Sequence, residues 1–145
     1  MAPFTVLHVC VGNICRSPTA EWLLRHRLKR EGVSVESAGL AAMVGNPIDP
    51  IAESVLVEHG VTGAAHVARQ ISPEMINAAD IVLVMDKRHM SAVHAQVPHA
   101  RGKTFLLGRW QNDAAVPDPY GKTRPAFEQA YRMIDTAVDS WLSRF

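Results

Sequence analysis

The chain has 145 residues, of which 48% are hydrophobic and 20% charged, and this composition excludes a wholly disordered protein. A net charge of +1 gives no reason to expect a nucleic-acid partner. No run of about 18 apolar residues occurs, so no membrane insertion is predicted, and the opening stretch MAPFTVLHV lacks the basic region of a secretory signal. Without a signal or a span, a cytoplasmic location is expected by default. Only two cysteines are present, Cys10 and Cys15, which argues against a disulfide scaffold, and the cytosol keeps thiols reduced.

Strand and helix patterns alternate along the chain, which predicts one α/β domain over residues 1–145 on a parallel sheet. The expected strands cover residues 4–9, 33–38, 80–85 and 103–107. Ser17, Asp49 and Ser72, each followed by a proline, are the expected caps of the first three helices. Helices are also expected over 87–96 and in the C-terminal region, where an apolar stripe predicts core packing. The intervening loop, 108–125, has a length typical of functional or disordered loops.

The turn between the first strand and the first helix carries Cys10 and Arg16 in Cys-x5-Arg spacing. The N–H groups of such a turn and of the following helix start can form a nest for an anion. We expect Gly12 to supply a backbone angle that other residues resist, and Arg16 to match two phosphate oxygens with its planar fork. The same electric field favours the thiolate of a cysteine, so Cys10 is predicted to attack phosphorus.

Two rival sites for this turn lack their residues. A P-loop NTPase needs G-x-x-x-x-G-K-[ST], which does not occur, and the cysteines lack the C-x2-C spacing of zinc sites. His89, His94 and His99 are five residues apart, which predicts surface histidines on different helix faces. Cleavage of a phosphoester also needs a proton for the leaving oxygen, and Asp118 in VPDPYG, stiffened by its flanking prolines, is the candidate donor.

Five segments, CVGNICRSP, VESAG, HVARQIS, LVMD and DPYG, resemble segments of the low-molecular-weight protein tyrosine phosphatases in the same order along the chain. The resemblance implies a phosphotyrosine protein phosphatase I-like fold, a Rossmann-like three-layer sandwich in which a four-stranded parallel sheet has helices on both faces. It also implies hydrolysis of phosphotyrosine to release inorganic phosphate, with no metal or organic cofactor, because backbone amides and an arginine neutralise the charge.

The resemblance carries family roles onto matching positions. Cys10 would form a phosphocysteine intermediate, and Arg16 would clamp the phosphate. Asp118 would protonate the leaving phenolate and then activate water, while Ser17 would hydrogen-bond the Cys10 sulfur. The loop amides would come from Val11, Gly12, Asn13, Ile14, Cys15 and Arg16.

The same comparison implies residues that support or surround the loop. Asn13, Ser37 and His66 would form a polar network that holds the loop in shape. Leu40 and Tyr120 would wall a cleft deep enough for an aryl phosphate and too deep for the shorter phosphoserine. The forms SAGL and VPDPYGK resemble the bacterial branch linked to exopolysaccharide and capsule production, whose usual partner is a membrane tyrosine autokinase with a tyrosine-rich tail.

Three alternatives stay open at this point. Cys15 is either a small buried packing residue or a resolving thiol that forms a reversible disulfide with oxidised Cys10. An arsenate reductase of the same fold would relay electrons through later cysteines, and none follows Cys15. A non-catalytic phosphotyrosine-binding protein would bind without turnover, although Cys10, Arg16 and Asp118 are all present.

Overall fold

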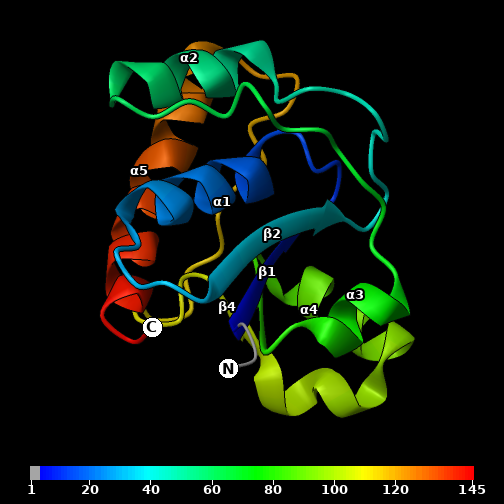
Figure 1. Cartoon of the computed structure of the whole chain (residues 1–145). Helices are drawn as coiled ribbons and strands as arrows, with labels where there is room; N and C mark the ends of the chain where they lie inside the picture. The colour runs from blue at the N-terminus through cyan, green and yellow to red at the C-terminus, as the bar shows by residue number, and fades with distance from the viewer. Residues whose placement is uncertain (1–3) are drawn as a thin grey trace.

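A single parallel sheet organises the computed structural model, which describes residues 4–145 (Figure 1). Residues 1–3, which open the stretch predicted not to be a secretory signal, lie outside the described residues. The strands lie in the order β2-β1-β3-β4, and every neighbouring pair is parallel. Their bounds are β1 Phe4–Cys10, β2 Val33–Gly39, β3 Ile81–Val84 and β4 Thr104–Leu106.

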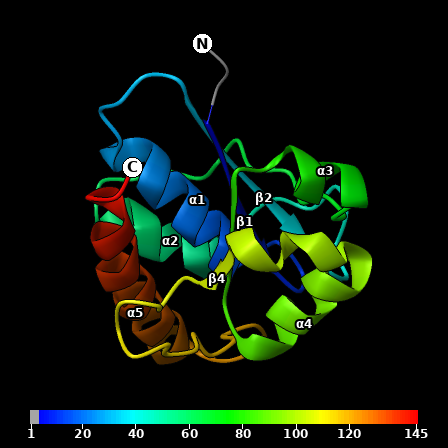
Figure 2. The ribbon, with the colours of Figure 1, turned by 90° about the horizontal axis from the view of Figure 1, so that it is seen from below.

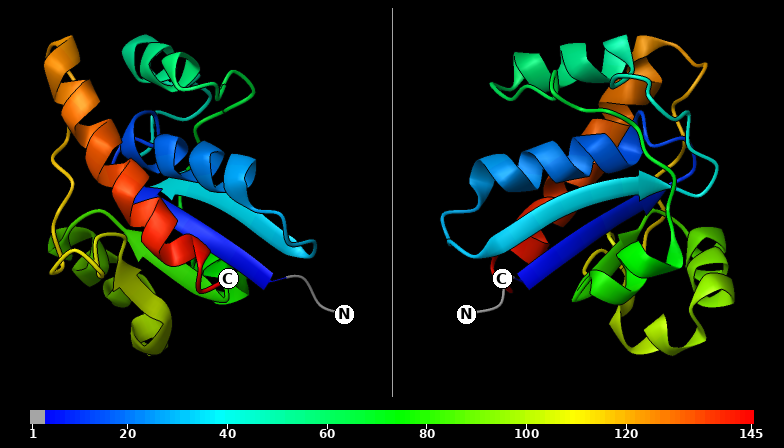
Figure 3. Two further views of the ribbon diagram at one scale, coloured as in Figure 1. Left: turned by 90° about the vertical axis from the view of Figure 1, so that its left-hand side faces the viewer. Right: turned by 45° about the vertical axis from the view of Figure 1, so that its right-hand side comes forward.

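Helices cover both faces of the sheet, which confirms the predicted three-layer arrangement (Figures 1 and 2). One face carries α1 (Arg16–Arg27) and α5 (Arg124–Leu142), with α2 (Pro50–Glu58) packed against both. The other carries α3 (Pro73–Ala78) and α4 (Lys87–Gln96), and the short 3-10 helix η1 (Pro98–Lys103) follows α4. Figure 3 shows the first group of helices on one side of the strands and the second group on the other. Within residues 4–145 no helix is both long and apolar enough to span a bilayer.

Alternation along β1 divides the core between the two faces. Val6 and Cys10 join the apolar cluster that includes α1 and α5, whereas Leu7 and Val9 join the cluster beneath α3 and α4. A central parallel strand buried on both faces needs apolar residues at nearly every position, as β1 has. The exception is His8, which is fully buried among them.

The helix starts are as predicted for α2 and α3 and different for α1. The side chains of Asp49 and Ser72 accept hydrogen bonds from Ile51 N and Met75 N, which confirms both caps. The prediction that Ser17 caps α1 is wrong. The helix begins at Arg16 with no side-chain cap, because the Ser17 hydroxyl is engaged inside the preceding loop.

The central position of β1 determines where a ligand site can form. From β1 the chain crosses to β2 on one side, and β3 pairs with β1 on the other. Crevices in open parallel sheets form at such a switch point, beyond the carboxyl ends of the strands. The loop 11–15 leaves β1 at this edge and leads directly into α1.

Candidate active site

The loop after β1 turns all its carbonyl groups away from its centre. Each carbonyl from Cys10 to Cys15 accepts a hydrogen bond from a group outside the loop. Leu40 N donates to Cys10 O (2.9 Å), Ala41 N to Val11 O (3.0 Å) and Met43 N to Gly12 O (3.0 Å). His66 Nε2 donates to Asn13 O (2.6 Å), Asp49 N to Ile14 O (2.8 Å), and Thr19 N and Oγ1 to Cys15 O (3.1 and 2.7 Å). The loop is therefore held from outside by segments distant in sequence.

These outward carbonyls leave six N–H groups facing the other way, because the N–H and C=O of a trans peptide point in opposite directions. Within residues 4–145, no N–H group from Val11 to Arg16 donates to a protein acceptor. Six converging, unpaired N–H groups at a helix N-terminus form a binding site for an oxyanion.

The thiol at the base of this nest is held by a polar network. Cys10 Sγ lies 2.9 Å from Ser17 Oγ, and Asn13 Nδ2 donates to Ser17 Oγ (2.8 Å) and to Ser37 Oγ (3.0 Å). The Ser37 hydroxyl donates in turn to Glu21 Oε1 (2.6 Å). All five side chains are buried, so each polar group needs the partner that it has here.

Asn13, rather than Gly12, carries the unusual backbone angle of the loop. Asn13 has φ of 58°, in the left-handed region that asparagine tolerates better than most residues. Its Oδ1 accepts from Arg69 N at 2.9 Å, and its carbonyl accepts from His66. The prediction for Gly12 is wrong, since Gly12 has no positive φ and a Cβ there would meet nothing closer than 3.7 Å.

Arg16 is 4% exposed and lies among three acceptors. Its NH1 group donates to the carbonyl of Val116 (3.0 Å) and lies 4.0 Å from Asp86 Oδ2. Its NH2 group lies 3.6 Å from Oδ2 of Asp118, whose side chain is 50% exposed. Asp118 Oδ1 accepts from Tyr120 N at 3.1 Å, which fixes the carboxylate near the mouth of the site. Cys10, Arg16 and Asp118 thus line one pocket, although Cys10 and Asp118 are 108 positions apart in sequence.

That pocket is lined by some of the predicted site residues and not by others. Its lining residues are Cys10, Val11, Gly12, Ile14, Cys15, Arg16, Ala41, Met43, Asp118 and Tyr120. The side chain of Leu40 does not line it and packs, partly buried, against the core beneath α3 and α4. Ala41 and Met43, which follow Leu40, line the pocket instead, and their N–H groups bond to the carbonyls of Val11 and Gly12. Asn13, Ser17, Ser37 and His66 lie behind the loop.

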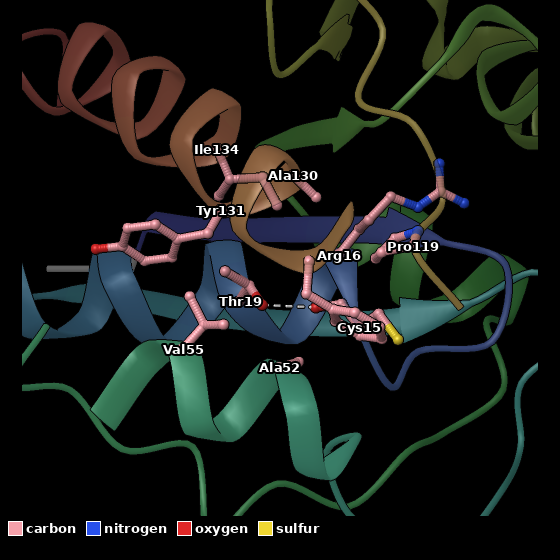
Figure 4. A pocket seen from close by; sticks show the side chains of 10 residues that line it. Cys15, Arg16, Thr19, Ala52, Val55, Pro119, Ala130, Tyr131 and Ile134 are labelled. Carbon is pink, nitrogen blue, oxygen red and sulfur yellow. Dashed lines mark hydrogen bonds between the residues drawn. The ribbon is translucent and has the colours of Figure 1, made fainter. Parts of the chain in front are cut away.

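Cys15 lies where the active-site pocket meets a cavity between α1, α2 and α5 (Figure 4). Thr19 donates to its carbonyl, and the side chains of Ala52 and Ala130 line the same cavity. Burial, helped by the nearby Asp49 carboxylate, raises the pKa of the Cys15 thiol, which keeps it neutral. Both cysteines are free thiols, and the reversible disulfide with Cys10 stays a prediction.

Two charged groups behind the site were not assigned a role from the sequence. Glu21 is buried and lies between Ser37 and Arg25, whose NH2 group is 2.9 Å from Glu21 Oε2. Asp86 caps α4 and faces Arg16. Although burial alone would raise it, the pKa of Asp86 is lowered by the backbone N–H groups of His89 and Arg88. Glu21 lies inside the predicted first helix and Asp86 directly follows the predicted strand 80–85, but only the fold brings both to the site.

The expectation that three histidines lie on the surface holds for His99 and fails for His89. His89 is 3% exposed, because α4 turns it inward beside Asp86. His94 is partly buried. Within residues 4–145, no group of three or more His, Cys, Asp or Glu side chains is arranged to hold a metal ion.

Comparisons with known proteins agree with this geometry. Residues 5–145 match the family described as low molecular weight phosphotyrosine protein phosphatase. The low molecular weight protein-tyrosine-phosphatase Wzb of Escherichia coli K12 is 46% identical over 136 residues, covering 94% of this chain and 91% of that protein. Its counterpart Etp from the same strain is 44% identical over 140 residues, covering 97% and 93%. The structure of Vibrio vulnificus Wzb in complex with benzylphosphonate superposes with a TM-score of 0.93 at 40% identity, covering 98% of this chain and 99% of that one. The chain therefore belongs to the low molecular weight phosphotyrosine protein phosphatase family.

Proposed function

We propose that this protein hydrolyses phosphotyrosine in proteins through a phosphocysteine intermediate on Cys10. The observation that carries the proposal is the ring of six unpaired N–H groups around the Cys10 thiol, closed by the buried Arg16 guanidinium. This arrangement suits the three equatorial oxygens of a phosphoryl group during transfer. The bound benzylphosphonate in Vibrio vulnificus Wzb, a phosphonate on an aromatic group, supports the same ligand class.

In the first step, the Cys10 thiolate attacks phosphorus and the bond from phosphorus to the phenolic oxygen breaks. Asp118 transfers a proton to that oxygen, so the product leaves as neutral tyrosine. The exposure of its side chain at the pocket and its distance of 3.6 Å from Arg16 support this role. The Arg16 fork and the loop amides stabilise the charge on the transferred phosphoryl group.

In the second step, Asp118 takes a proton from water, which attacks the phosphocysteine and releases inorganic phosphate. The bond from phosphorus to sulfur breaks, and the returning Cys10 thiolate accepts the hydrogen bond of Ser17, whose oxygen lies 2.9 Å away. Asn13 holds the Ser17 hydroxyl by donating to its oxygen, so the Ser17 proton remains available for sulfur. No metal or organic cofactor is required by these steps.

Substrate length is selected by the walls of the pocket. Met43 and Tyr120 stand at its rim, and the Cys10 thiol lies at its base. A phosphotyrosine side chain spans this depth, whereas the shorter phosphoserine does not bring its phosphate to Cys10. In this proposal Met43 and Ala41 take the role that the sequence comparison gave to Leu40.

The physiological substrate that we propose is a bacterial tyrosine autokinase that controls exopolysaccharide production. The support is the SAGL and VPDPYGK forms of the sequence together with the bacterial Wzb and Etp relatives. A cytoplasmic location fits, because the reaction needs Cys10 as a reduced thiol and the cytosol keeps thiols reduced. We propose that residues 1–145 form one catalytic domain.

The test is phosphate release from a phosphotyrosine peptide in EDTA by the wild type and Cys10→Ser, with the matched phosphoserine peptide as control. Turnover of the first peptide by the wild type alone supports the proposal. Stoichiometric binding without turnover would identify a phosphotyrosine-binding protein instead. Loss of activity in EDTA, or equal rates on both peptides, would contradict the mechanism or the proposed substrate class.

A further inference from the structure

The guanidinium of Arg16 has two neighbours, Val116 and Asp86, that do not line the pocket of Cys10. Val116 holds NH1 by its carbonyl at 3.0 Å, and the Asp86 carboxylate lies 4.0 Å from the same nitrogen. Figure 4 shows the Arg16 side chain extending past Pro119, toward the loop that follows β4. An arginine that must present a flat fork to phosphate depends on such anchors, because a shift of about 1 Å in a positioned group can cost on the order of 100-fold in rate.

Asp86 is itself fixed unequally at its two oxygens. Oδ1 accepts from Arg88 N (2.8 Å) and His89 N (3.2 Å), the first free N–H groups of α4. Oδ2 faces Arg16 and has two further neighbours, Arg88 NH2 and His89 Nε2, each at 3.4 Å. The Arg88 side chain is 92% exposed, so its attraction draws Oδ2 toward solvent, whereas His89 lies in the interior.

The protonation of His89 follows from its other ring nitrogen. Nδ1 accepts a hydrogen bond from Met85 N at 3.4 Å, so the proton of the neutral ring is on Nε2, the nitrogen that faces Asp86. Burial lowers the pKa of His89 and keeps the ring neutral. The charged groups facing it are Asp86 and Asp118, which oppose this lowering, and Arg16 and Arg88, which add to it.

We propose that His89 is a positioning residue for Arg16: its polar Nε2–H, 3.4 Å from Asp86 Oδ2, attracts that oxygen to the interior side, against the guanidinium that clamps phosphate. This inference rests on the proposed function of Arg16. The path runs from the main chain of Met85 through the imidazole to Asp86 and then to Arg16, so the end of β3 and the start of α4 set the direction of the clamp. His89 does not touch the substrate in this account.

Two substitutions separate this role from packing. In His89→Gln, the side-chain amide nitrogen lies three bonds from Cβ, as Nε2 does, and can still donate to Asp86. In His89→Asn, the carbonyl oxygen lies two bonds from Cβ, as Nδ1 does, and can accept from Met85 while nothing reaches Asp86. His89→Gln therefore keeps the contact with Asp86, and His89→Asn keeps the contact with Met85. Both variants lose part of the volume of the ring.

The measurements are the inhibition constant of inorganic phosphate, and KM and kcat for para-nitrophenyl phosphate, with the unfolding midpoint of each variant. We expect His89→Asn to weaken phosphate binding and raise KM by on the order of 10-fold, the loss typical when a partner that orients a ligand is removed. His89→Gln should stay within a few-fold of the wild type. Equal phosphate binding by the two variants, or weaker binding by His89→Gln, would overturn the proposal.

An Asp86→Asn background tests whether His89 acts through Asp86. There, His89→Asn should weaken phosphate binding no further, and an undiminished additional loss would refute the path. If the variants do not fold, ¹⁵N NMR of histidine in the wild type at pH 7 replaces them. A neutral Nε2–H ring at His89 is expected, and an Nδ1–H tautomer or an imidazolium would overturn the inference. Failure of the wild type to turn over phosphotyrosine would instead reject the function itself, which keeps the two failures distinct.

Discussion

His8 makes the stability of this protein depend on pH. The side chain lies in the middle of the central strand with 0% exposure, and within residues 4–145 neither ring nitrogen has a hydrogen-bond partner. Burial lowers the pKa of His8 from 6.5 to about 3, because a charged imidazolium would lose its hydration with nothing to replace it. The folded protein therefore keeps His8 neutral under conditions in which the unfolded chain protonates it.

The sign and size of the effect follow from this difference. Between pH 6.5 and 3 the unfolded chain binds a proton that the folded state does not, so stability falls as the pH falls. Each pH unit below 6.5 costs about 1.4 kcal/mol. Lowering the pH from 7 to 5 should therefore remove about 2 kcal/mol from the free energy of unfolding, a large share of the roughly 5–15 kcal/mol of a typical domain.

The assay is urea denaturation at pH 7 and pH 5 of the wild type, His8→Leu and His26→Gln. The wild type should lose about 2 kcal/mol more than His8→Leu between the two pH values, because leucine has no proton to bind. His26 is exposed on α1, so His26→Gln should follow the wild type and serve as the control for removing a histidine. The same loss in the wild type and His8→Leu would refute the reasoning.

Four further substitutions test the loop, the strand end beside it and the proton donor. Gly12→Ala should keep the activity within a few-fold, since a Cβ there meets only side-chain atoms at 3.7 Å or more. Gly39→Ala should strongly reduce activity, because its Cβ would lie 2.5 Å from the carbonyl oxygen of Val11. Initial rates and the unfolding midpoint check both substitutions. Asn13→Ala should lower the free energy of unfolding by about 1–3 kcal/mol, measured in urea, because it leaves buried partners unsatisfied and places alanine at φ of 58°. Asp118→Asn should lower kcat/KM, which reports the step in which the leaving group departs, by about 10²–10⁴ on a phosphotyrosine peptide, and by less on para-nitrophenyl phosphate, whose leaving group needs no proton.

Each of these expectations has an outcome that contradicts it. A severe loss in Gly12→Ala would mean that the loop needs more room than the structure shows. Full activity in Gly39→Ala would show that the loop can move away from β2 at no cost. If Asn13→Ala were as stable as the wild type, the polar network around Asn13 would not stabilise the fold. An equal loss of kcat/KM on both substrates in Asp118→Asn would contradict the protonation of the leaving group by Asp118, because only that role depends on the leaving group.

Sequence patterns located the elements well, because those patterns are local. The apolar run of β1, the caps Asp49 and Ser72 and the stripe along α5 depend on neighbouring residues, and the structure confirms them. The family motif likewise predicted Cys10 and Arg16, six positions apart, as one site, and both line the same pocket. Local patterns were less informative where one residue type suits two structural roles. Serine is a residue type typical of helix caps, but the Ser17 hydroxyl lies 2.9 Å from the Cys10 sulfur instead.

What the tertiary structure alone decided depends on contacts between residues distant in sequence. The amides of Leu40, Met43 and Asp49 and the ring of His66 turn the loop carbonyls outward, and no local pattern reports this. The same contacts place the left-handed angle on Asn13 rather than Gly12, and they bring Met43 rather than Leu40 to the pocket. The burial of His89 beside Asp86 has the same origin. A local motif thus predicted which groups react, whereas the packing of remote segments determined where those groups point, because direction is set by hydrogen bonds that only the folded chain can form.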